Sequence, residues 1–219
     1  MDTCVSELGS RGEVHGFVAD LSKTADAEAL HRFASELGPV DVLVNNVGIF
    51  SVKSFETLTD DEWLHYFNLN VLSAVRMTRL LLPEMLERGT GSVVNLASEA
   101  AVKPLPQMVH YSVTKTSMLG LTRGLAELTK GTQVRVNSVL PGPTWTEGVQ
   151  AYFQGLAEQK REPLDSIVEN YFKNDEPTSL IQRFVRPEEV AKMIVFVSSS
   201  MAANGAGYRI EGGIIRSIL

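Results

Sequence analysis

Apolar positions in the first part of the chain follow two different periods. From Thr24 to Leu37 they recur at helical spacing, and the pattern stops at Gly38-Pro39. This predicts an amphipathic helix that is capped by Thr24. Val40 to Val44 is apolar without alternation, so we expect a strand that is buried on both faces, as in a parallel sheet.

The same two patterns continue along the chain. The expected elements are the end of a helix over 2–8, a strand over 13–21, the helix and strand above, a helix over 59–86 that Pro83 bends or ends, a strand over 92–97, a helix over 107–129, a strand over 134–140, a helix from Pro187 through Val197 and a strand over 208–210. Connections of this length allow right-handed crossovers. The order therefore predicts a single α/β domain over 1–219, built on a Rossmann-like doubly wound parallel sheet.

Residues 144–186 interrupt this regular order. Helices are expected over about 147–160 and 163–173, and several of the residues are aromatic: Trp145, Tyr152, Phe153, Tyr171 and Phe172. Aromatic side chains on such helices suit a substrate lid over an apolar pocket. The alternative is that the rings only pack this segment onto the domain.

Composition excludes several classes of function. The 219 residues carry a formal net charge of −6, which argues against a surface that binds nucleic acid or an anionic membrane. We see no apolar run of transmembrane length and expect no signal peptide. The single cysteine, Cys4, has no partner for a disulfide or a cysteine-rich metal site. These features favour a cytoplasmic enzyme.

The stretch from Ser92 to Lys115 carries the clearest chemistry. Tyr111 and Lys115 are four residues apart on a predicted helix, so they project from the same face. An ammonium beside a phenol favours the phenolate, so we expect the pKa of Tyr111 to fall toward neutrality. Ser98, at the end of the preceding strand, adds a hydroxyl to the same place.

Other motifs accompany this stretch in a definite order. Asn45-Asn46-Val47-Gly48 ends an earlier strand, Asn70 lies in a long helix, and Pro141-Gly142 follows a later strand. Together with Ser98 and the Tyr-x-x-x-Lys pair, these motifs resemble the short-chain dehydrogenase/reductase family. The resemblance covers nearly the whole chain.

The resemblance implies a proton relay. Tyr111 would be the acid or base for a ketone or secondary alcohol, Ser98 would polarise the substrate oxygen, and Lys115 would lower the pKa of Tyr111 and bind the nicotinamide ribose. Asn70 would hold a water that links Lys115 to solvent. Hydride transfer would belong to NAD or NADP, and the sequence does not distinguish between these two cofactors.

The resemblance also implies a set of cofactor contacts. Asp20 and Leu21 match the residues beside the adenine. Asn46, Val47 and Gly48 lie where a strand end approaches the ribose, with Val47 in place of the usual alanine. The carboxamide segment is matched by Pro141, Gly142, Thr144 and Thr146.

Substrate choice would depend on residues around this core. The candidates are Glu99, Val102, Gln107, Met108, His110, Trp145 and the lid aromatics. His110 is next to Tyr111 but faces another direction on the helix, which favours a surface or supporting role. No His, Cys or carboxylate cluster has the spacing of a metal site, so we expect no catalytic metal. Ser98 lacks the G-x-S-x-G context of a hydrolase.

One family feature is missing from the sequence. A dinucleotide-binding fold begins with a strand, a Gly-rich turn and a helix, and the family pattern T-G-x-x-x-G-x-G does not occur here. We expect the chain to begin within the second helix of the family fold, without the first strand, first helix and second strand. Either these residues belong to the full molecule, or the chain is a truncated product.

These alternatives lead to two hypotheses of function. The first is an NAD(P)-dependent oxidoreductase for a small carbonyl or alcohol, assembled as a homodimer or homotetramer. The second is a cofactor-less relative that acts only as an oligomerisation or scaffold module through the helices over 60–86 and 107–129.

Overall fold

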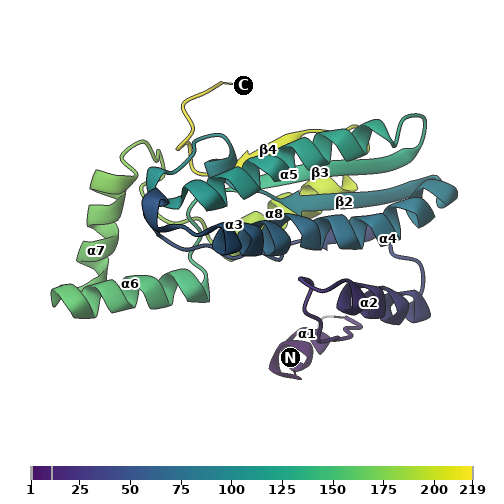
Figure 1. Ribbon diagram of the computed structural model, residues 1–219, viewed down its shortest axis with the longest axis horizontal. Helices are drawn as coiled ribbons and strands as arrows, with labels where there is room; N and C mark the ends of the chain where they lie inside the picture. Colours follow the sequence, from purple (N-terminus) through teal and green to yellow (C-terminus); the bar gives the residue numbers. More distant parts are fainter. Residues whose placement is uncertain (1, 11, 219) are drawn as a thin grey trace.

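A parallel sheet forms the centre of the computed structural model, which describes residues 2–10 and 12–218 (Figure 1). Its strands are β1 (Val42–Asn45), β2 (Thr90–Leu96), β3 (Gln133–Pro141) and β4 (Gly207–Ile210), and they lie in the order β1-β2-β3-β4. Every neighbouring pair is parallel. The carboxyl ends of all four strands therefore meet at one edge of the sheet.

Helices cover both faces of this sheet. On one face, α4 (Ser73–Arg88) packs on β1 and β2, and α5 (Val109–Glu127) packs on β2 and β3. On the other face, α8 (Pro187–Ser199) packs on β2, β3 and β4. The helix α2 (Thr24–Leu37) lies outside α4 (Figure 1). The predicted fold class, an α/β fold with a doubly wound parallel sheet, is confirmed.

Successive residues of β2 separate two cores. Val93 packs with Leu81 and Met85 beneath α4, whereas Val94 packs with Val197 beneath α8. Both valines have no exposed surface. A strand buried on both faces carries apolar residues without alternation, which is why this segment was recognisable in the sequence.

A buried polar network crosses three of the strands. Asn45 Nδ2 on β1 donates to Asn95 Oδ1 on β2 over 2.8 Å, and Asn95 Nδ2 donates to Thr122 Oγ1 over 2.9 Å. Thr122 Oγ1 lies 2.6 Å from Ser138 Oγ on β3. A one-residue shift of any strand would leave these buried groups unpaired, so the network favours a single register.

The predicted strand over 13–21 is wrong. Residues 13–20 form no β-ladder with any described residue. The Phe17 ring instead packs on Phe33 of α2, with ring centroids 5.1 Å apart, and Val18 remains 77% exposed. Apolar residues suited to a strand form one only where a neighbouring strand supplies hydrogen-bond partners.

The strand over 40–44 exists as β1, but its predicted burial on both faces is wrong. Val42 is 44% exposed and Val44 is 39% exposed, whereas Asn45 is buried. The exposed side chains point to the α8 side of the sheet, and α8 packs on the other three strands. The unbroken apolar sequence therefore predicted a helix over both faces of β1, whereas the face on the α8 side is partly exposed.

Helix boundaries differ from the prediction in three places. Lys23, not Thr24, is the N-cap of α2. Pro83 does not end its helix, because α4 continues to Arg88 and stops at Gly89, whose φ of 72° is left-handed. The expected helix over 59–86 is also divided: α3 (Asp60–Phe67) and α4 are joined by a π-helical turn, η2 (Asn68–Leu72).

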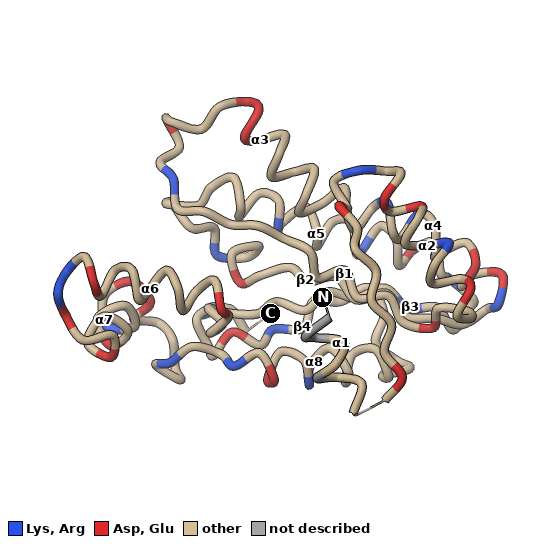
Figure 2. Tube along the Cα trace, turned by 90° about the horizontal axis from the view of Figure 1, so that it is seen from below, with Lys and Arg blue, Asp and Glu red and all other residues tan. Residues whose placement is uncertain are grey.

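The first helix, α1 (Asp2–Gly9), agrees with the predicted helix end. The side chains of residues 1–4 are not described, so the expectation for Cys4 lies outside the described side chains. Among the described residues, no helix is long and apolar enough to cross a membrane. Charged residues of both signs are dispersed over the helices and loops (Figure 2).

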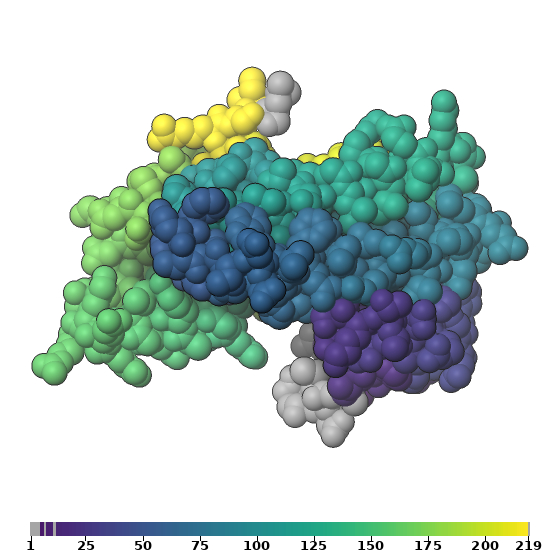
Figure 3. All heavy atoms as spheres, viewed as in Figure 1, coloured from purple at the N-terminus to yellow at the C-terminus, as the bar shows by residue number. Residues whose placement is uncertain are grey.

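The segment after β3 forms a separate projection. Its helices are α6 (Glu147–Lys160) and α7 (Leu164–Asn170), followed by a π-helical turn, η5 (Tyr171–Asp175). Phe153, Ile167, Phe172 and Phe184 form an apolar cluster of their own within it. Figure 3 shows this segment in green, extending from the end of the molecule that lies away from α2.

Replacing Leu81 with alanine tests the core beneath α4. Leu81 is 3% exposed and belongs to the cluster around Val93. We expect Leu81→Ala to lower the free energy of unfolding by about 2–5 kcal/mol, because it leaves a cavity. The matched change Leu180→Ala, at a side chain that is 83% exposed, should change it by no more than about 0.5 kcal/mol. Urea unfolding measures both, and equal losses would contradict the described core.

Candidate active site

A cavity of about 1470 Å³ opens at the carboxyl ends of the strands. Its walls come from the segment after β1, the end of β2, the first turns of α5, the segment after β3, and the projection formed by α6, α7 and η5. In open parallel sheets, ligands bind at this edge. Ser98, Tyr111 and Lys115 all lie in the cavity wall.

Local structure brings these three side chains together. Ser98 follows β2 and caps the short 3-10 turn η3 (Glu99–Ala101), because its Oγ accepts a hydrogen bond of 3.1 Å from Ala100 N–H. Lys115 Nζ reaches back to the end of β2 and donates to Leu96 O over 2.7 Å. It lies 5.7 Å from the centre of the Tyr111 ring. The four-residue spacing on α5 thus places both side chains on the cavity side, as predicted.

Asn70 lies behind this wall, in the π-helical turn η2. Its Oδ1 accepts from Ile49 N–H over 2.7 Å, and its Nδ2 donates to Ile49 O and to Thr114 Oγ1, both over 3.0 Å. The side chain therefore fixes the segment that follows β1. A Cβ atom on Gly48 would lie 3.4 Å from both Asn70 Oδ1 and Lys115 Nζ, so the absence of a side chain there keeps this corner of the cavity open.

Burial dominates the electrostatics of the two helix residues. It raises the pKa of Tyr111, the Glu99 carboxylate adds to this, and a hydrogen bond with Ser98 opposes it. Burial lowers the pKa of Lys115 to about 8, and Glu99 opposes that change. The expected fall in the pKa of Tyr111 is therefore wrong for the protein without ligands. The lysine ammonium lies over the ring, too far away to offset the loss of solvent.

Glu99 is a second ionisable group in the cavity wall. Its side chain is buried, and burial raises the carboxyl pKa to about 7, with a further contribution from Glu176. The Ser98 hydroxyl donates to Glu99 Oε2 over 2.5 Å and lowers this pKa. The Glu176 carboxylate has its own counterion, because it pairs with Lys103 over 2.5 Å.

The structure brings together most of the predicted cofactor-binding residues. Besides Tyr111 and Lys115, six of them line the cavity: Asn46, Gly48, Pro141, Gly142, Thr144 and Thr146. Three do not. The Asp20 carboxylate accepts from Ser22 N–H and Ser22 Oγ in its own turn, Leu21 packs against the α4 core, and Val47 is 43% exposed.

Donors at one end of the cavity fit the nicotinamide half of a dinucleotide. Lys115 Nζ supplies a cation for ribose hydroxyls, and Thr144 and Thr146 add polar groups from the segment after β3. Gly142 lets the Glu211 backbone pack closely against this segment, because a Cβ there would lie 2.8 Å from the Glu211 Cα. The open corner at Gly48 lies beside Lys115 Nζ and Asn70 Oδ1.

The substrate-pocket candidates divide in the same way. Glu99, Gln107 and Met108 line the cavity, together with Tyr152, Phe153 and Tyr171 of the projection. Val102 is 45% exposed and does not line it, and Trp145 packs on Phe184 at a ring-centroid distance of 4.7 Å.

His110 is neither on the surface nor in the cavity wall. Its side chain has no exposed surface, and its ring packs edge-to-face on Tyr66 with centroids 4.3 Å apart. Burial lowers its pKa. Of the two roles predicted for it, the surface role is wrong.

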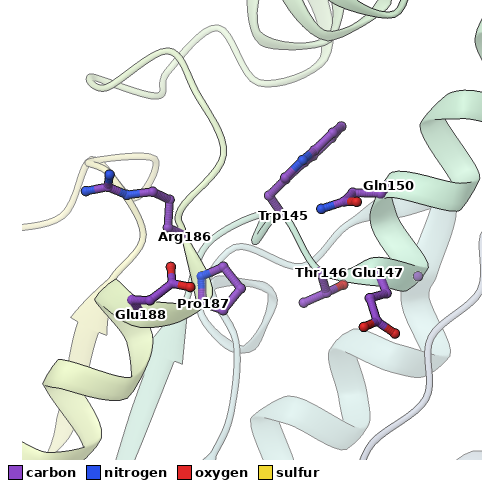
Figure 4. A pocket seen from close by; sticks show the side chains of 8 residues that line it. Trp145, Thr146, Glu147, Gln150, Arg186, Pro187 and Glu188 are labelled. Carbon is purple, nitrogen blue, oxygen red and sulfur yellow. The ribbon is translucent and has the colours of Figure 1, made fainter. Parts of the chain in front are cut away.

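A smaller hollow of about 600 Å³ lies beside Thr146, between the starts of α6 and α8. Figure 4 shows Arg186 and Glu188 on one side of it and Glu147 and Gln150 on the other. It shares Thr146 and Pro187 with the larger cavity. Among the described residues, no group of three or more His, Cys, Asp or Glu side chains is placed to hold a metal ion.

Two features of the site were not apparent from the sequence. The sequence suggested Glu99 only as a lining residue, and its contact with Ser98 was missed. The burial of Glu176 at 4% exposure was also missed. A glutamate in the otherwise small and apolar run Ala97-Ser98-Glu99-Ala100-Ala101 is the signal that marks Glu99, because an acid rarely lies in such a run unless it has a partner.

Comparison with known proteins gives consistent findings. The sequence model of the family described as short chain dehydrogenase matches residues 1–157. The uncharacterized oxidoreductase YvrD of Bacillus subtilis is 54% identical, over 100% of this chain and 84% of that protein. The D-beta-hydroxybutyrate dehydrogenase of Cupriavidus necator is 33% identical, over 97% of this chain and 83% of that protein. Among solved structures, the L-sorbose reductase of Gluconobacter frateurii, complexed with NADPH and L-sorbose, matches with a TM-score of 0.90 and 28% identity, over 99% of this chain and 82% of that one.

Glu99→Gln tests the burial of this carboxyl through the pH dependence of stability. The pKa of Glu99 is about 7 in the folded protein, above the ordinary value of 4.5. Between pH 4.5 and about pH 7 the folded state therefore binds more protons than the unfolded state. The wild type loses stability as the pH rises through this range. Glutamine does not ionise, so we expect equal stability near pH 4.5 and an advantage of about 3 kcal/mol for the variant at pH 8.

Urea unfolding at the two pH values measures this advantage. Glu56→Gln, at an exposed carboxylate, is the control and should show no such change. An advantage of Glu99→Gln that stays constant with pH would contradict the described burial.

Proposed function

This chain belongs to the short-chain dehydrogenase family, and we propose that it interconverts a ketone and a secondary alcohol with NAD or NADP as the hydride carrier. It is an oxidoreductase of that family with an NAD(P)-binding Rossmann-type fold. The observation that carries the proposal is that a hydroxyl, a phenol and an ammonium, from Ser98, Tyr111 and Lys115, line one cavity at the carboxyl edge of the sheet.

In the proposed reduction, the substrate oxygen lies between the Ser98 hydroxyl and the Tyr111 phenol. A bound nicotinamide would supply the hydride for the carbonyl carbon. Tyr111 then donates its proton to the oxygen, and the raised pKa of this phenol keeps that proton in place until the oxygen becomes basic. Oxidation of an alcohol runs in reverse, with the Tyr111 phenolate as the base.

Lys115 and Asn70 complete the proposed proton relay. The pKa of Lys115 is about 8, so this side chain exchanges a proton near neutral pH more readily than an ordinary lysine. Asn70 anchors the Ile49 backbone beside it. We assign Asn70 the role of holding this corner open for a water between Lys115 and solvent.

The relatives argue for a small polar substrate without naming it. One is named for a hydroxy acid and another for a sugar. The cavity here combines aromatic side chains with Glu99, Asn170, Asn174 and Glu176, a mixture that suits a small molecule with polar substituents. We further propose that residues 144–186 act as the substrate lid, because α6, α7 and η5 contribute one whole wall.

We also propose a homodimer or homotetramer that is formed through the long helices. Leu64 and Phe67 of α3 and Val113 of α5 are exposed apolar side chains, with exposures of 69%, 39% and 44%. Burial of such residues against a second copy is the usual driving force for assembly.

Tyr111→Phe tests the central role. We expect this change to lower carbonyl reduction by at least about a thousandfold, because the proton donor is lost while the ring that packs in the wall is kept. Turnover is measured as oxidation of NADH and NADPH with ethyl acetoacetate, acetoacetate and L-sorbose as probe ketones. The rise in melting temperature that the better cofactor produces should be nearly the same in wild type and variant.

Two results would contradict this proposal. Retained turnover in Tyr111→Phe would refute the assigned role of the phenol. A wild-type protein that shows no thermal shift with either cofactor would favour the scaffold hypothesis instead. Tyr208→Phe, which removes the hydroxyl of a tyrosine in β4 that does not line the cavity, is the matched control and should keep the wild-type turnover.

A further inference from the structure

Three partners use the full hydrogen-bonding capacity of the Ser98 hydroxyl. Its Oγ donates to Glu99 Oε2 over 2.5 Å, accepts from Ala100 N–H over 3.1 Å, and also hydrogen-bonds the Tyr111 phenol. A hydroxyl has one proton and two acceptor positions. While Glu99 is ionised, the single proton of Ser98 is held by the carboxylate, and only lone pairs remain for the cavity.

A carbonyl oxygen needs a donor from Ser98, not a lone pair. If Glu99 carries a proton, its own O–H can donate to Ser98 Oγ, and the Ser98 proton is released toward the cavity. In this arrangement Ser98 Oγ accepts from both Glu99 O–H and Ala100 N–H, so its two acceptor positions are filled and its proton is directed to the cavity. The direction of one short hydrogen bond therefore controls what Ser98 offers to a substrate.

We propose that Glu99 is a positioning residue whose protonation state decides whether the Ser98 hydroxyl donates to Glu99 or to the carbonyl oxygen of the substrate. This inference rests on the proposed oxidoreductase function. It makes protonated Glu99 the form that is competent for carbonyl reduction. Ionised Glu99 leaves Ser98 as an acceptor, which suits the hydroxyl of an alcohol before oxidation.

The surroundings of Glu99 keep both forms accessible. The carboxyl is 6% exposed, and burial favours the neutral form. Ionisable groups act on it from two elements: Tyr111 and Lys115 of α5, and Tyr171 and Glu176 in and beside η5. Lys103 is paired with Glu176. The carboxyl pKa of about 7 follows from burial opposed by the Ser98 hydrogen bond, so both protonation states are populated near neutral pH.

The first arm of the test observes Glu99 without turnover. Protein labelled with [δ-¹³C]glutamate is titrated by NMR, and Glu99→Gln identifies the resonance by its loss. Ser98→Ala removes the donor to the ionised carboxylate, so we expect the Glu99 midpoint to rise by about one pH unit. Ser117→Ala, at a partly exposed serine of α5 that does not line the cavity, should leave the midpoint unchanged.

The second arm measures the pH profile of kcat/KM for reduction of the probe ketones. In the wild type we expect kcat/KM for reduction to fall as the pH rises and Glu99 ionises. The amide of Glu99→Gln donates to Ser98 at every pH, so the variant should lack this fall while retaining any later one. The ratio of variant to wild-type kcat/KM should rise about tenfold by one pH unit above the Glu99 midpoint.

Each arm can overturn the proposal separately from the proposed function. A Glu99 midpoint that Ser98→Ala does not move would overturn it, and so would a Glu99→Gln profile with the same fall as the wild type. If no probe ketone turns over but Ser98→Ala still moves the midpoint, the oxidoreductase activity has failed and the coupling of Ser98 to Glu99 stands.

Discussion

The hydrogen-bonded chain from Asn45 through Asn95 and Thr122 to Ser138 is the constraint on which the site depends. It meets β1 at its last residue, Asn45, and it meets β2 and β3 near their carboxyl ends, at Asn95 and Ser138. Each link is buried, so a shift in register would leave amide or hydroxyl groups without partners. Gly48, Ser98 and Gly142 follow the three strand ends, so the register that this polar network fixes also sets their relative positions.

Burial determines the charge state of the ionisable side chains at this site. It raises the pKa values of Tyr111 and Glu99 and lowers that of Lys115. All three shifts favour neutral groups, and the Glu99 carboxylate only partly opposes the shift of Lys115. A site of this kind holds its protons on oxygen, which is the arrangement that proton donation to a carbonyl requires. A bound cofactor would change this balance through its own charge.

The sequence predicted the parts of the molecule that local rules determine. Tyr111 and Lys115 share a face because helix geometry fixes their spacing, and β2 was recognisable because it is covered on both faces. Residues 13–21 and Val42 show where this reasoning stops. Both have sequences that suit a buried strand, but strand pairing and burial depend on neighbours that are distant in the chain. The Glu99 contact was missed for a related reason, since the sequence shows an unusual residue without showing which hydroxyl it meets.

Transfer of deuterium from cofactor to product tests the account most directly. Reduced NADPH or NADH, labelled with deuterium at the transferring carbon, is incubated with the protein and L-sorbose or ethyl acetoacetate, and the alcohol is analysed by mass spectrometry. The account predicts one deuterium on the carbinol carbon, from one face of the nicotinamide only. A product without deuterium, or deuterium from both faces equally, would contradict hydride transfer within this cavity.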